Sequence, residues 1–336
     1  MQKRCSLVFT LLVLGLLASG SVRADGPEVG SSPPSLASVA WGTQGTSFEA
    51  LKGKTVVVIT YVTWCPICNG WSKEALRSVP KEIADKPIVV LAISTDTPPQ
   101  KAQPYLKDRG LIGPQILVGY DPTIATRFGF SNKFFNYAII GPDSKVVASG
   151  NVGSHYPNAD GSKTYVLEKE LTSRTDFGQF QFLTDEMSDS LKKLVFPMEL
   201  GSYPTAADSA RVKQGLKAAD REAFEKMLNT FLDERLADAK QQSDGEASDK
   251  ISAYETASYL SLTFKATEQG KEAKKLVTEL AKDKNLKKEL SAKRAYDDLM
   301  KLPATDPARQ AGLRSFTKKF ADTHYAKVAS GIEVDE

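Results

Sequence analysis

The sequence predicts an α/β domain, with a mixed sheet flanked by helices, followed by an all-α helical region. Two observations support this division. From Val39 to about Arg174, short apolar runs rich in β-branched residues alternate with helical stretches, which is typical of a sheet covered by helices. From about Thr205 onward the chain is rich in Ala, Lys, Glu, Asp and Leu and has few β-branched clusters, which indicates helices.

The N-terminus has the three parts of an export signal. Lys3 and Arg4 precede an apolar stretch over 7–18, and Val22-Arg23-Ala24 resembles a cleavage site. About twelve apolar residues are too few for a helix that spans a bilayer, so we expect no membrane span once the signal is removed. We therefore predict a signal peptide over 1–24 and a periplasmic or secreted protein.

Composition also predicts the remaining domain boundaries. Gly, Pro and Ser dominate 25–38, which predicts a flexible leader. We expect the α/β domain to cover 39–174 and the helical domain to cover 205–336. Between them, Phe-Pro, Gly-Ser and Tyr-Pro pairs mark a connector over 175–204.

The balance of charge excludes one class of partner. Cleavage after Ala24 would remove three of the 44 basic residues and none of the 41 acidic ones, so the mature chain is close to neutral. Nucleic-acid binding therefore lacks its main electrostatic support, and we expect no nucleic-acid partner.

The most informative motif is Trp64-Cys65-Pro66-Ile67-Cys68. The only other cysteine, Cys5, lies in the predicted signal, so the mature pair has no third thiol to bond with. Two cysteines separated by two residues can close a small disulfide and reopen it, as thiol–disulfide exchange requires. A structural zinc site usually needs four ligands, and a c-type haem site needs His where this chain has Asn69. We predict redox exchange without metal or cofactor, with a purely structural disulfide as the alternative.

The residues around the pair place it at the start of a helix. Thr55–Tyr61 is almost wholly apolar and predicts a strand buried on both faces. Helical spacing follows over Ser72–Ile83, with a kink expected at Pro80. Cys65 would thus lie at a helix N-terminus, where free backbone N–H groups and the helix dipole stabilise a thiolate. Pro66 fits the first turn because proline loses no hydrogen bond there.

The other elements of the first domain are separated by turns that contain Pro, Gly or Asp. We expect a strand over Pro87–Ser94, a helix over Thr97–Arg109, a strand over Gln115–Val118, a short helix from Asp121 to Phe128, a hairpin of Tyr137–Ile140 with Lys145–Ser149, and a helix over Thr164–Arg174.

This order of elements resembles the thioredoxin superfamily, in its exported TlpA-like and redoxin-like branch. The resemblance rests on Val56–Tyr61 with the Trp-Cys-Pro-Ile-Cys motif, on Val89–Asp96, and on Ala138–Val147 in the position of the family's late hairpin. It implies a thioredoxin-like fold and a thiol–disulfide oxidoreductase. Its partners would be protein thiols or disulfides and a redox partner protein.

The resemblance also assigns roles to the motif. By match, Cys65 is the nucleophile, Cys68 resolves the mixed disulfide, and Trp64 and Pro66 are supporting residues. The Pro-Ile pair between the cysteines resembles oxidant and glutaredoxin-type motifs more than the Gly-Pro of thioredoxin. It implies a reduction potential above the value of about −270 mV for thioredoxin.

Three departures from the family's pattern concern the site. Phe135, or its neighbour Phe134, stands where the family has a cis-proline, and we expect a trans bond and an altered substrate groove there. Ile59 and Trp71 occupy two positions where relatives carry a proton-moving acid. Gly70 weakens the first turns of the helix by about 1 kcal/mol.

His155 is a candidate proton partner for the cysteines. In this fold the last hairpin strand is parallel to the strand that leads into Cys65, so the loop that carries His155 lies at the same end of the sheet. A lone histidine is more often a surface or packing residue. A copper or zinc site of Cys65, Cys68 and His155, as in copper-delivering relatives, is another alternative. Peroxidase activity is disfavoured because Val62 stands where such relatives have Thr or Ser.

The C-terminal half predicts a helical bundle packed on or tethered to the redox domain. Leu260, Phe264, Ala273 and Val277 are spaced like one tetratricopeptide-type helix pair around Gly270, but only one copy is visible. We expect this half to serve as a protein-docking surface. The competing hypothesis for the whole chain is therefore a redox-inert, thioredoxin-fold binding module. The predicted helices are Ala206–Lys240, Ala247–Glu268, Lys271–Lys282, Leu286–Lys301 and Ala308–Ala329.

Overall fold

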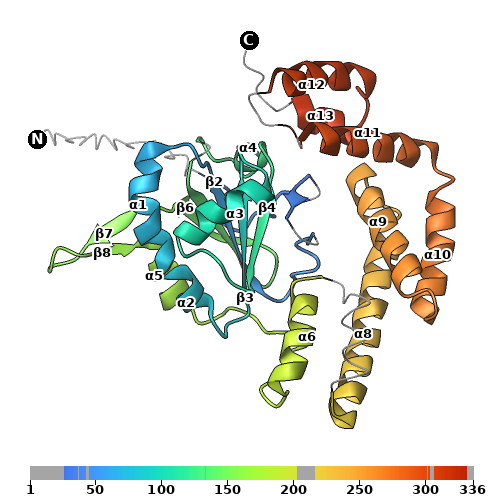
Figure 1. The fold of residues 1–336 in the computed structure, drawn as a ribbon, viewed down its shortest axis with the longest axis horizontal. Helices are drawn as coiled ribbons and strands as arrows, with labels where there is room; N and C mark the ends of the chain where they lie inside the picture. The colour runs from blue at the N-terminus through green and yellow to red at the C-terminus, as the bar shows by residue number, and fades with distance from the viewer. Residues whose placement is uncertain are drawn as a thin grey trace, which may run out of the picture.

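The computed structural model describes residues 26–36, 38–42, 45–132, 134–202, 216–300, 302 and 306–330. An α/β domain lies beside a helical domain, and α6 (Asp189–Glu199) lies below and between them in Figure 1. The predicted signal peptide lies outside the described residues. The fold class is the one that the sequence predicts, a mixed sheet flanked by helices and followed by further helices.

Six strands form the sheet: β1 (Ala40–Trp41), β2 (Thr55–Tyr61), β3 (Ile88–Ser94), β4 (Ile116–Tyr120), β5 (Asn136–Ile140) and β6 (Val146–Asn151). Their order is β1-β4-β3-β2-β5-β6. β2, β3 and β4 are parallel, β5 is antiparallel to β2, and β6 is antiparallel to β5. β6 therefore runs parallel to β2, as the sequence predicts.

The two faces of the sheet have separate cores. Every residue of β2 and β3 is buried, which their apolar and β-branched sequences suit. Val57 and Ile59 face a layer that contains α1 (Pro66–Arg77), α2 (Val79–Ile83), α3 (Pro99–Asp108) and α5 (Val166–Ser173). Val56 and Val58 face the opposite layer, which contains α4 (Ile124–Arg127) and side chains of the segment before β2.

One predicted helix of the α/β domain is in fact two. The expected helix over 72–83 is divided between α1, which already begins at Pro66, and α2. The break falls at Ser78 because Pro80 has no N–H with which to continue the hydrogen bonds of α1, whereas it is tolerated in the first turn of α2.

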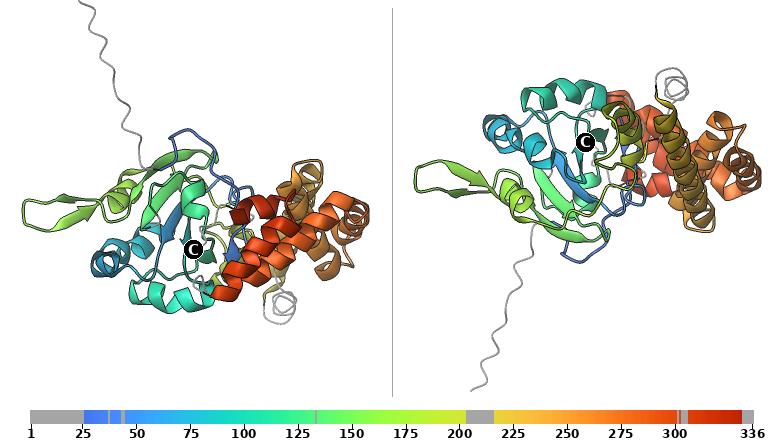
Figure 2. Two further views of the ribbon diagram at one scale, coloured as in Figure 1. Left: turned by 90° about the horizontal axis from the view of Figure 1, so that it is seen from above. Right: turned by 90° about the horizontal axis from the view of Figure 1, so that it is seen from below.

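Two segments carry structure that the sequence analysis did not predict. β7 (His155–Pro157) and β8 (Lys163–Tyr165) form an antiparallel hairpin that projects from the domain in both views of Figure 2. Part of the predicted flexible leader lies along β6. The Gly30 N–H donates to the Val146 carbonyl (2.8 Å), and the Val146 N–H donates to the Ser31 carbonyl (2.9 Å). These bonds cover part of an otherwise open sheet edge.

The helical domain contains a third core. Its close-packed pair of α9 and α10 depends on Gly270, because a Cβ there would lie 2.1 Å from the Phe264 carbonyl oxygen. The expected helix over 308–329 is wrong as a single element. The helix that begins at Pro307 ends at Lys319, and the Thr323 hydroxyl accepts the Ala326 N–H and caps a new helix that begins at His324. The helices are α8 (Ala218–Gln242), α9 (Ala247–Thr263), α10 (Glu268–Leu280), α11 (Lys284–Met300), α12 (Pro307–Lys319) and α13 (His324–Ser330).

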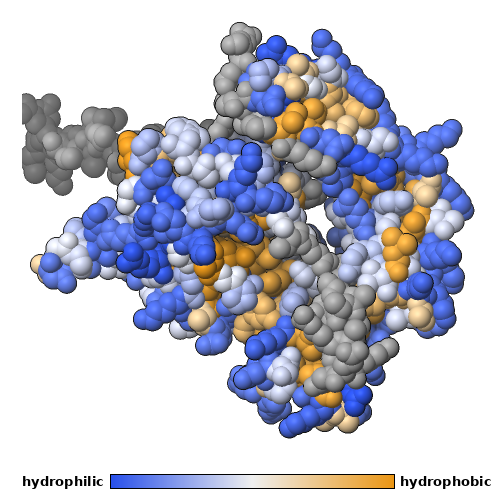
Figure 3. All heavy atoms as spheres, in the orientation of Figure 1, coloured by the Kyte–Doolittle hydropathy of each residue, from blue (hydrophilic) through white to orange (hydrophobic). Residues whose placement is uncertain are grey.

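The surface of the helical domain is largely polar. Hydrophilic side chains cover most of its outer rim in Figure 3. The first helix predicted for this domain, Ala206–Lys240, begins in a segment outside the described residues. From Ala218 onward the structure has α8. None of the helices that the structure describes combines the length and the apolar character needed to cross a bilayer.

Two buried cations hold the parts of the molecule together. Lys54, just before β2, forms an ion pair with Glu199 at the end of α6, with 2.8 Å between Nζ and Oε2. Arg309 of α12 lies over the ring of Tyr120 at the end of β4, 5.6 Å from the ring centroid. Tyr120 belongs to the same core cluster as the helices. The helical domain therefore packs directly on the β1–β4 side of the sheet.

Candidate redox site

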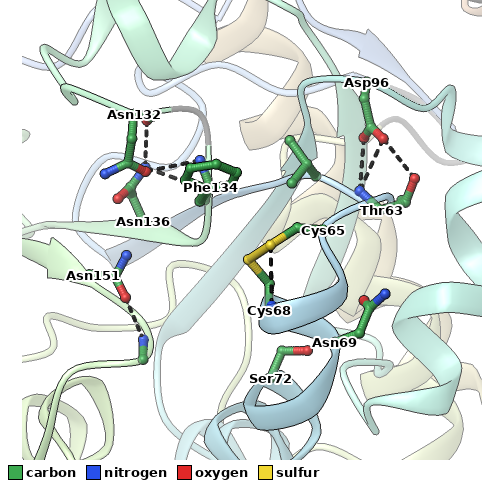
Figure 4. Close-up of a disulfide and its surroundings, with 12 residues drawn as sticks. Thr63, Cys65, Cys68, Asn69, Ser72, Asp96, Asn132, Phe134, Asn136 and Asn151 are labelled. Carbon is green, nitrogen blue, oxygen red and sulfur yellow. Dashed lines mark hydrogen bonds between the residues drawn. A yellow bond between two sulfur atoms is a disulfide. The ribbon is translucent and has the colours of Figure 1, made fainter.

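A disulfide joins Cys65 and Cys68 at the start of α1, shortly after β2 ends (Figure 4). Cys65 is the N-cap residue of α1, and its Sγ accepts a hydrogen bond from the Cys68 N–H at 3.2 Å. Pro66 stands in the first turn. The sequence predicts this arrangement, and it places the Cys65 sulfur at the positive end of the helix dipole, where a thiolate is favoured.

Apolar side chains surround the disulfide on the surface. Both cysteines are themselves buried, but Trp64 and Ile67 are exposed to solvent by 63% and 81%. The Trp64 ring packs edge-on against Phe134, with 5.9 Å between the ring centroids. Large exposed apolar groups of this kind are characteristic of surfaces that contact other molecules. Trp64 was a predicted supporting residue, whereas the exposure of Ile67 and Phe134 was not predicted.

Phe135 occupies the inner side of the site. Its side chain is fully buried in the core cluster that contains both cysteines, and its ring contacts those of Tyr61, Trp71 and Tyr105. The described backbone contains no cis peptide bond. The Phe135 ring thus lies in the same core as both cysteines, and the preceding Phe134 reaches the surface.

A carboxylate that the sequence analysis missed fixes the loop before Cys65. The oxygens of Asp96 accept hydrogen bonds from the Thr63 N–H (3.0 and 3.1 Å), the Thr63 hydroxyl (2.7 Å) and the Ser94 hydroxyl (2.8 Å). Asp96 follows β3, which is parallel to β2. The carboxyl ends of two adjacent parallel strands meet at one edge of the sheet, and this signal could have identified Asp96 from the sequence.

A buried polar network on the other side of the cysteines was also missed. It joins Asn69 and Ser72 of α1 to Tyr105 of α3 and to Arg109, which follows α3. The Tyr105 hydroxyl donates to Asn69 Oδ1 at 2.8 Å. Burial raises the pKa of Tyr105, and the nearby Arg109 charge acts in the opposite direction. No simple sequence pattern marks this network, because its members come from two helices.

His155 is exposed at the base of the β7–β8 hairpin. Its Nδ1 lies 2.9 Å from the Gly153 carbonyl oxygen, and its ring is 5.7 Å from that of Tyr165. These described contacts do not include either cysteine, so its role as a proton partner stays a prediction. Within the described residues, no three side chains of His, Cys, Asp or Glu gather as a metal site.

The fold and the disulfide define a thioredoxin-like oxidoreductase domain. The family model of redoxin matches residues 28–163, so the α/β part of this chain is similar to redoxin domains. A search of the curated proteins gave no match.

Solved structures of similar fold share 17% to 24% identity with this chain, and the three named here share 17%. They include a thiol:disulfide interchange protein from Bacteroides sp. (TM-score 0.31, 37% of this chain and 81% of that chain) and the thioredoxin domain of a thiol-disulfide oxidoreductase from Bacteroides vulgatus (0.31, 36% and 87%). DsbF from MTB, solved in mixed oxidised and reduced forms, is similar to this chain too (0.30, 43% and 95%). At these TM-scores the likeness carries no argument about activity.

Proposed function

We propose that this protein is an exported thiol–disulfide oxidoreductase that exchanges disulfides with protein substrates through Cys65 and Cys68. One observation carries the proposal. The Cys65 sulfur lies at the N-cap of α1, bonded to the Cys68 N–H, and exposed apolar side chains adjoin it. This combines an activated sulfur with a surface that can receive a polypeptide.

The exchange proceeds in two steps. In the reduced protein, the Cys65 thiolate attacks one sulfur of a client disulfide, forms a mixed disulfide and expels a client thiolate. Cys68 then loses its proton and attacks the Cys65 sulfur, which expels the second client thiolate and restores the Cys65–Cys68 disulfide. The client gains two electrons and the protein loses two. The reverse sequence oxidises a client dithiol, and a redox partner protein resets the cysteines in either direction.

The neighbouring residues have supporting roles in this proposal. Trp64, together with Phe134, offers an apolar platform beside Cys65 for a client segment. Pro66 starts the helix that activates the sulfur. Phe135 belongs to the buried core that contains both cysteines and helps to keep water out of it. His155 remains a proposed proton partner by its loop position alone.

Insulin reduction and oxidation of a reduced, unfolded substrate test the proposal directly. We expect Cys65→Ser to lower both rates to those measured without protein, because the remaining Cys68 is buried and has no second thiol with which to close a disulfide. Cys68→Ser should instead accumulate a mixed disulfide with its client, since the resolving thiol is absent. A matched control is Ser315→Ala, which changes an exposed serine of α12 in the helical domain and leaves both cysteines and their surroundings in place. Wild-type rates for Cys65→Ser would refute the proposed oxidoreductase activity.

The same trapping experiment addresses the binding-module alternative. If Cys68→Ser captures no client from a periplasmic extract while the intact protein still binds a partner, a redox-inert module is favoured. Export is tested by the N-terminal residue of the protein recovered from the periplasm or medium. Cleavage after Ala24 is the expected result, and an intact Met1 would contradict it.

A further inference from the structure

Arg109 is a buried cation next to the helix that carries the cysteines. Its side chain is only 4% exposed, and its guanidinium lies flat against Tyr105, 3.3 Å from the ring centroid. Arg109 is the C-cap residue of α3, so the charge is fixed to a rigid element. Neither the predicted reaction nor the redoxin match assigns it a role.

Three hydrogen bonds fix the guanidinium between α3 and α1. Nε donates to the Ser72 hydroxyl (2.8 Å), Nη2 donates to Asn69 Oδ1 (2.7 Å), and Nη1 donates to the Tyr105 carbonyl (2.9 Å). Asn69 directly follows Cys68, and Ser72 is four residues after Cys68, one turn along the same helix face. Figure 4 shows both side chains on the α1 side of the disulfide, opposite Asp96.

The buried side of this cation faces only neutral groups. In the described part of the chain, its one carboxylate partner is Asp108, at 3.4 Å, which is 53% exposed and also bonded to Lys73 at 2.8 Å. A buried charge without a buried counter-charge is costly. An anion formed nearby would offset that cost, and reduction of the disulfide produces an anion at α1.

We propose that Arg109 is a positioning residue that stabilises the anionic, reduced form of the Cys65–Cys68 dithiol through Asn69 and Ser72. The inference rests on the proposed function, because it concerns the same reactive pair. Arg109 would do the opposite of the buried acid that this chain lacks at Ile59, since a cation favours the thiolate and an anion opposes it.

The other charged and titratable groups around the pair come from four elements. Asp96 follows β3 and accepts hydrogen bonds from Thr63 and Ser94. Tyr61 of β2 and Tyr105 of α3 have pKa values raised by burial, so both stay neutral near pH 7. His155 is on β7 and exposed. Arg109 is therefore the one fixed buried cation described in this set.

Glutathione equilibration measures the effect. The protein disulfide and two glutathione thiols give the protein dithiol and one glutathione disulfide, so atoms and electrons balance. We expect Arg109→Gln to shift this equilibrium about tenfold toward the protein disulfide, equivalent to about 30 mV lower potential. The pKa of the thiols, measured by thiolate absorbance, should rise in parallel. Arg109→Lys, which keeps the charge, should recover most of both changes.

Two further variants distinguish the effect of the Arg109 charge on the equilibrium from a general effect of disturbing the fold. Arg309→Gln removes an equally buried arginine at the junction with the helical domain and should leave the equilibrium unchanged. Asp108→Asn changes an exposed position and removes the carboxylate partner of Arg109, so it should shift the equilibrium slightly toward the dithiol. This variant keeps the inference testable if Arg109→Gln does not fold.

The inference would be overturned if folded Arg109→Gln had a glutathione equilibrium constant within twofold of the wild-type value and an unchanged thiol pKa. It would also be overturned by equal shifts in Arg109→Gln and Arg309→Gln, or by a shift toward the disulfide in Asp108→Asn. These measurements need only the protein and glutathione. A protein that equilibrates as expected but exchanges with no client would refute the proposed function and leave the role of Arg109 intact.

Discussion

Replacing Glu199 with Gln is expected to destabilise the α/β domain by about 3–5 kcal/mol. Glu199 and its partner Lys54 are 0% and 1% exposed. The substitution leaves Lys54 as an uncompensated charge in the interior, at the point where the chain enters β2. The expected loss is a large fraction of the total stability of an ordinary domain, which is about 5–15 kcal/mol.

The carboxylate of Glu199 also accepts backbone hydrogen bonds, and these bonds determine which substitution of Glu199 costs more stability. Its oxygens accept the backbone N–H groups of Gln181, Phe182 and Leu183 at 3.0, 2.5 and 2.8 Å. A Gln side chain keeps an acceptor oxygen for these donors, whereas Ala leaves them without one, at about 1–3 kcal/mol for each buried donor. Glu199→Ala should therefore cost more than Glu199→Gln.

Urea denaturation followed by tryptophan fluorescence gives the required free energies of unfolding. All three tryptophans, Trp41, Trp64 and Trp71, lie in the α/β domain, so the signal reports on the domain in question. Combining Glu199→Gln with Lys54→Met should cost less than the sum of the two single changes by more than about 1 kcal/mol, because the double variant leaves no unpaired charge.

A surface pair provides the control for this experiment. Lys73 and Asp108 of the same α/β domain form an ion pair of 2.8 Å, but their side chains are 48% and 53% exposed. Lys73→Gln should therefore change the stability by no more than about 1 kcal/mol. If Glu199→Gln costs as little as this control, the argument from burial is wrong.

Other expected outcomes concern glycine and histidine. Gly270→Ala should destabilise the helical domain, because its Cβ would lie 2.1 Å from the Phe264 carbonyl oxygen, whereas Gly70→Ala, with nothing within 4 Å, should stabilise α1 by up to about 1 kcal/mol. Melting temperatures of both variants check this pair, and a loss at Gly70 as large as at Gly270 would contradict it. Burial lowers the pKa of His324, so the unfolded chain binds the proton more readily and stability should fall as pH drops below about 6.5. Melting followed by circular dichroism at pH 7.5 and 5.5 should show a smaller loss for His324→Gln, and an equal loss in both proteins would exclude His324 as its source.

Local sequence patterns were sufficient for the reactive pair. Cys65 and Cys68 follow an apolar strand and precede helical spacing, and Pro66 marks the first turn of the helix. These features act between residues close in the chain, so propensity and spacing predict them. The same reasoning predicted the kink at Pro80 but not the two separate helices on either side of Ser78. It also missed the end of α12 at Lys319 and the start of α13, which Thr323 caps.

The residues that tune the site could not be found in this way. Asp96, Tyr105 and Arg109 are 28 to 44 residues from the cysteines that they surround, and only the packing of β3 and α3 against β2 and α1 brings them there. The burial of Phe135 is likewise a consequence of β5 pairing with β2.

By itself, the sequence determined the class of chemistry and the order of elements, because a Cys-x-x-Cys pair and alternating apolar runs are short-range properties. Tertiary structure decided the electrical environment of the disulfide, with a carboxylate on one side and a guanidinium network on the other. It also decided how the two domains join, through Lys54 with Glu199 and Arg309 with Tyr120. Electrostatic effects depend on distance and burial in space, and neither can be obtained from positions along the chain.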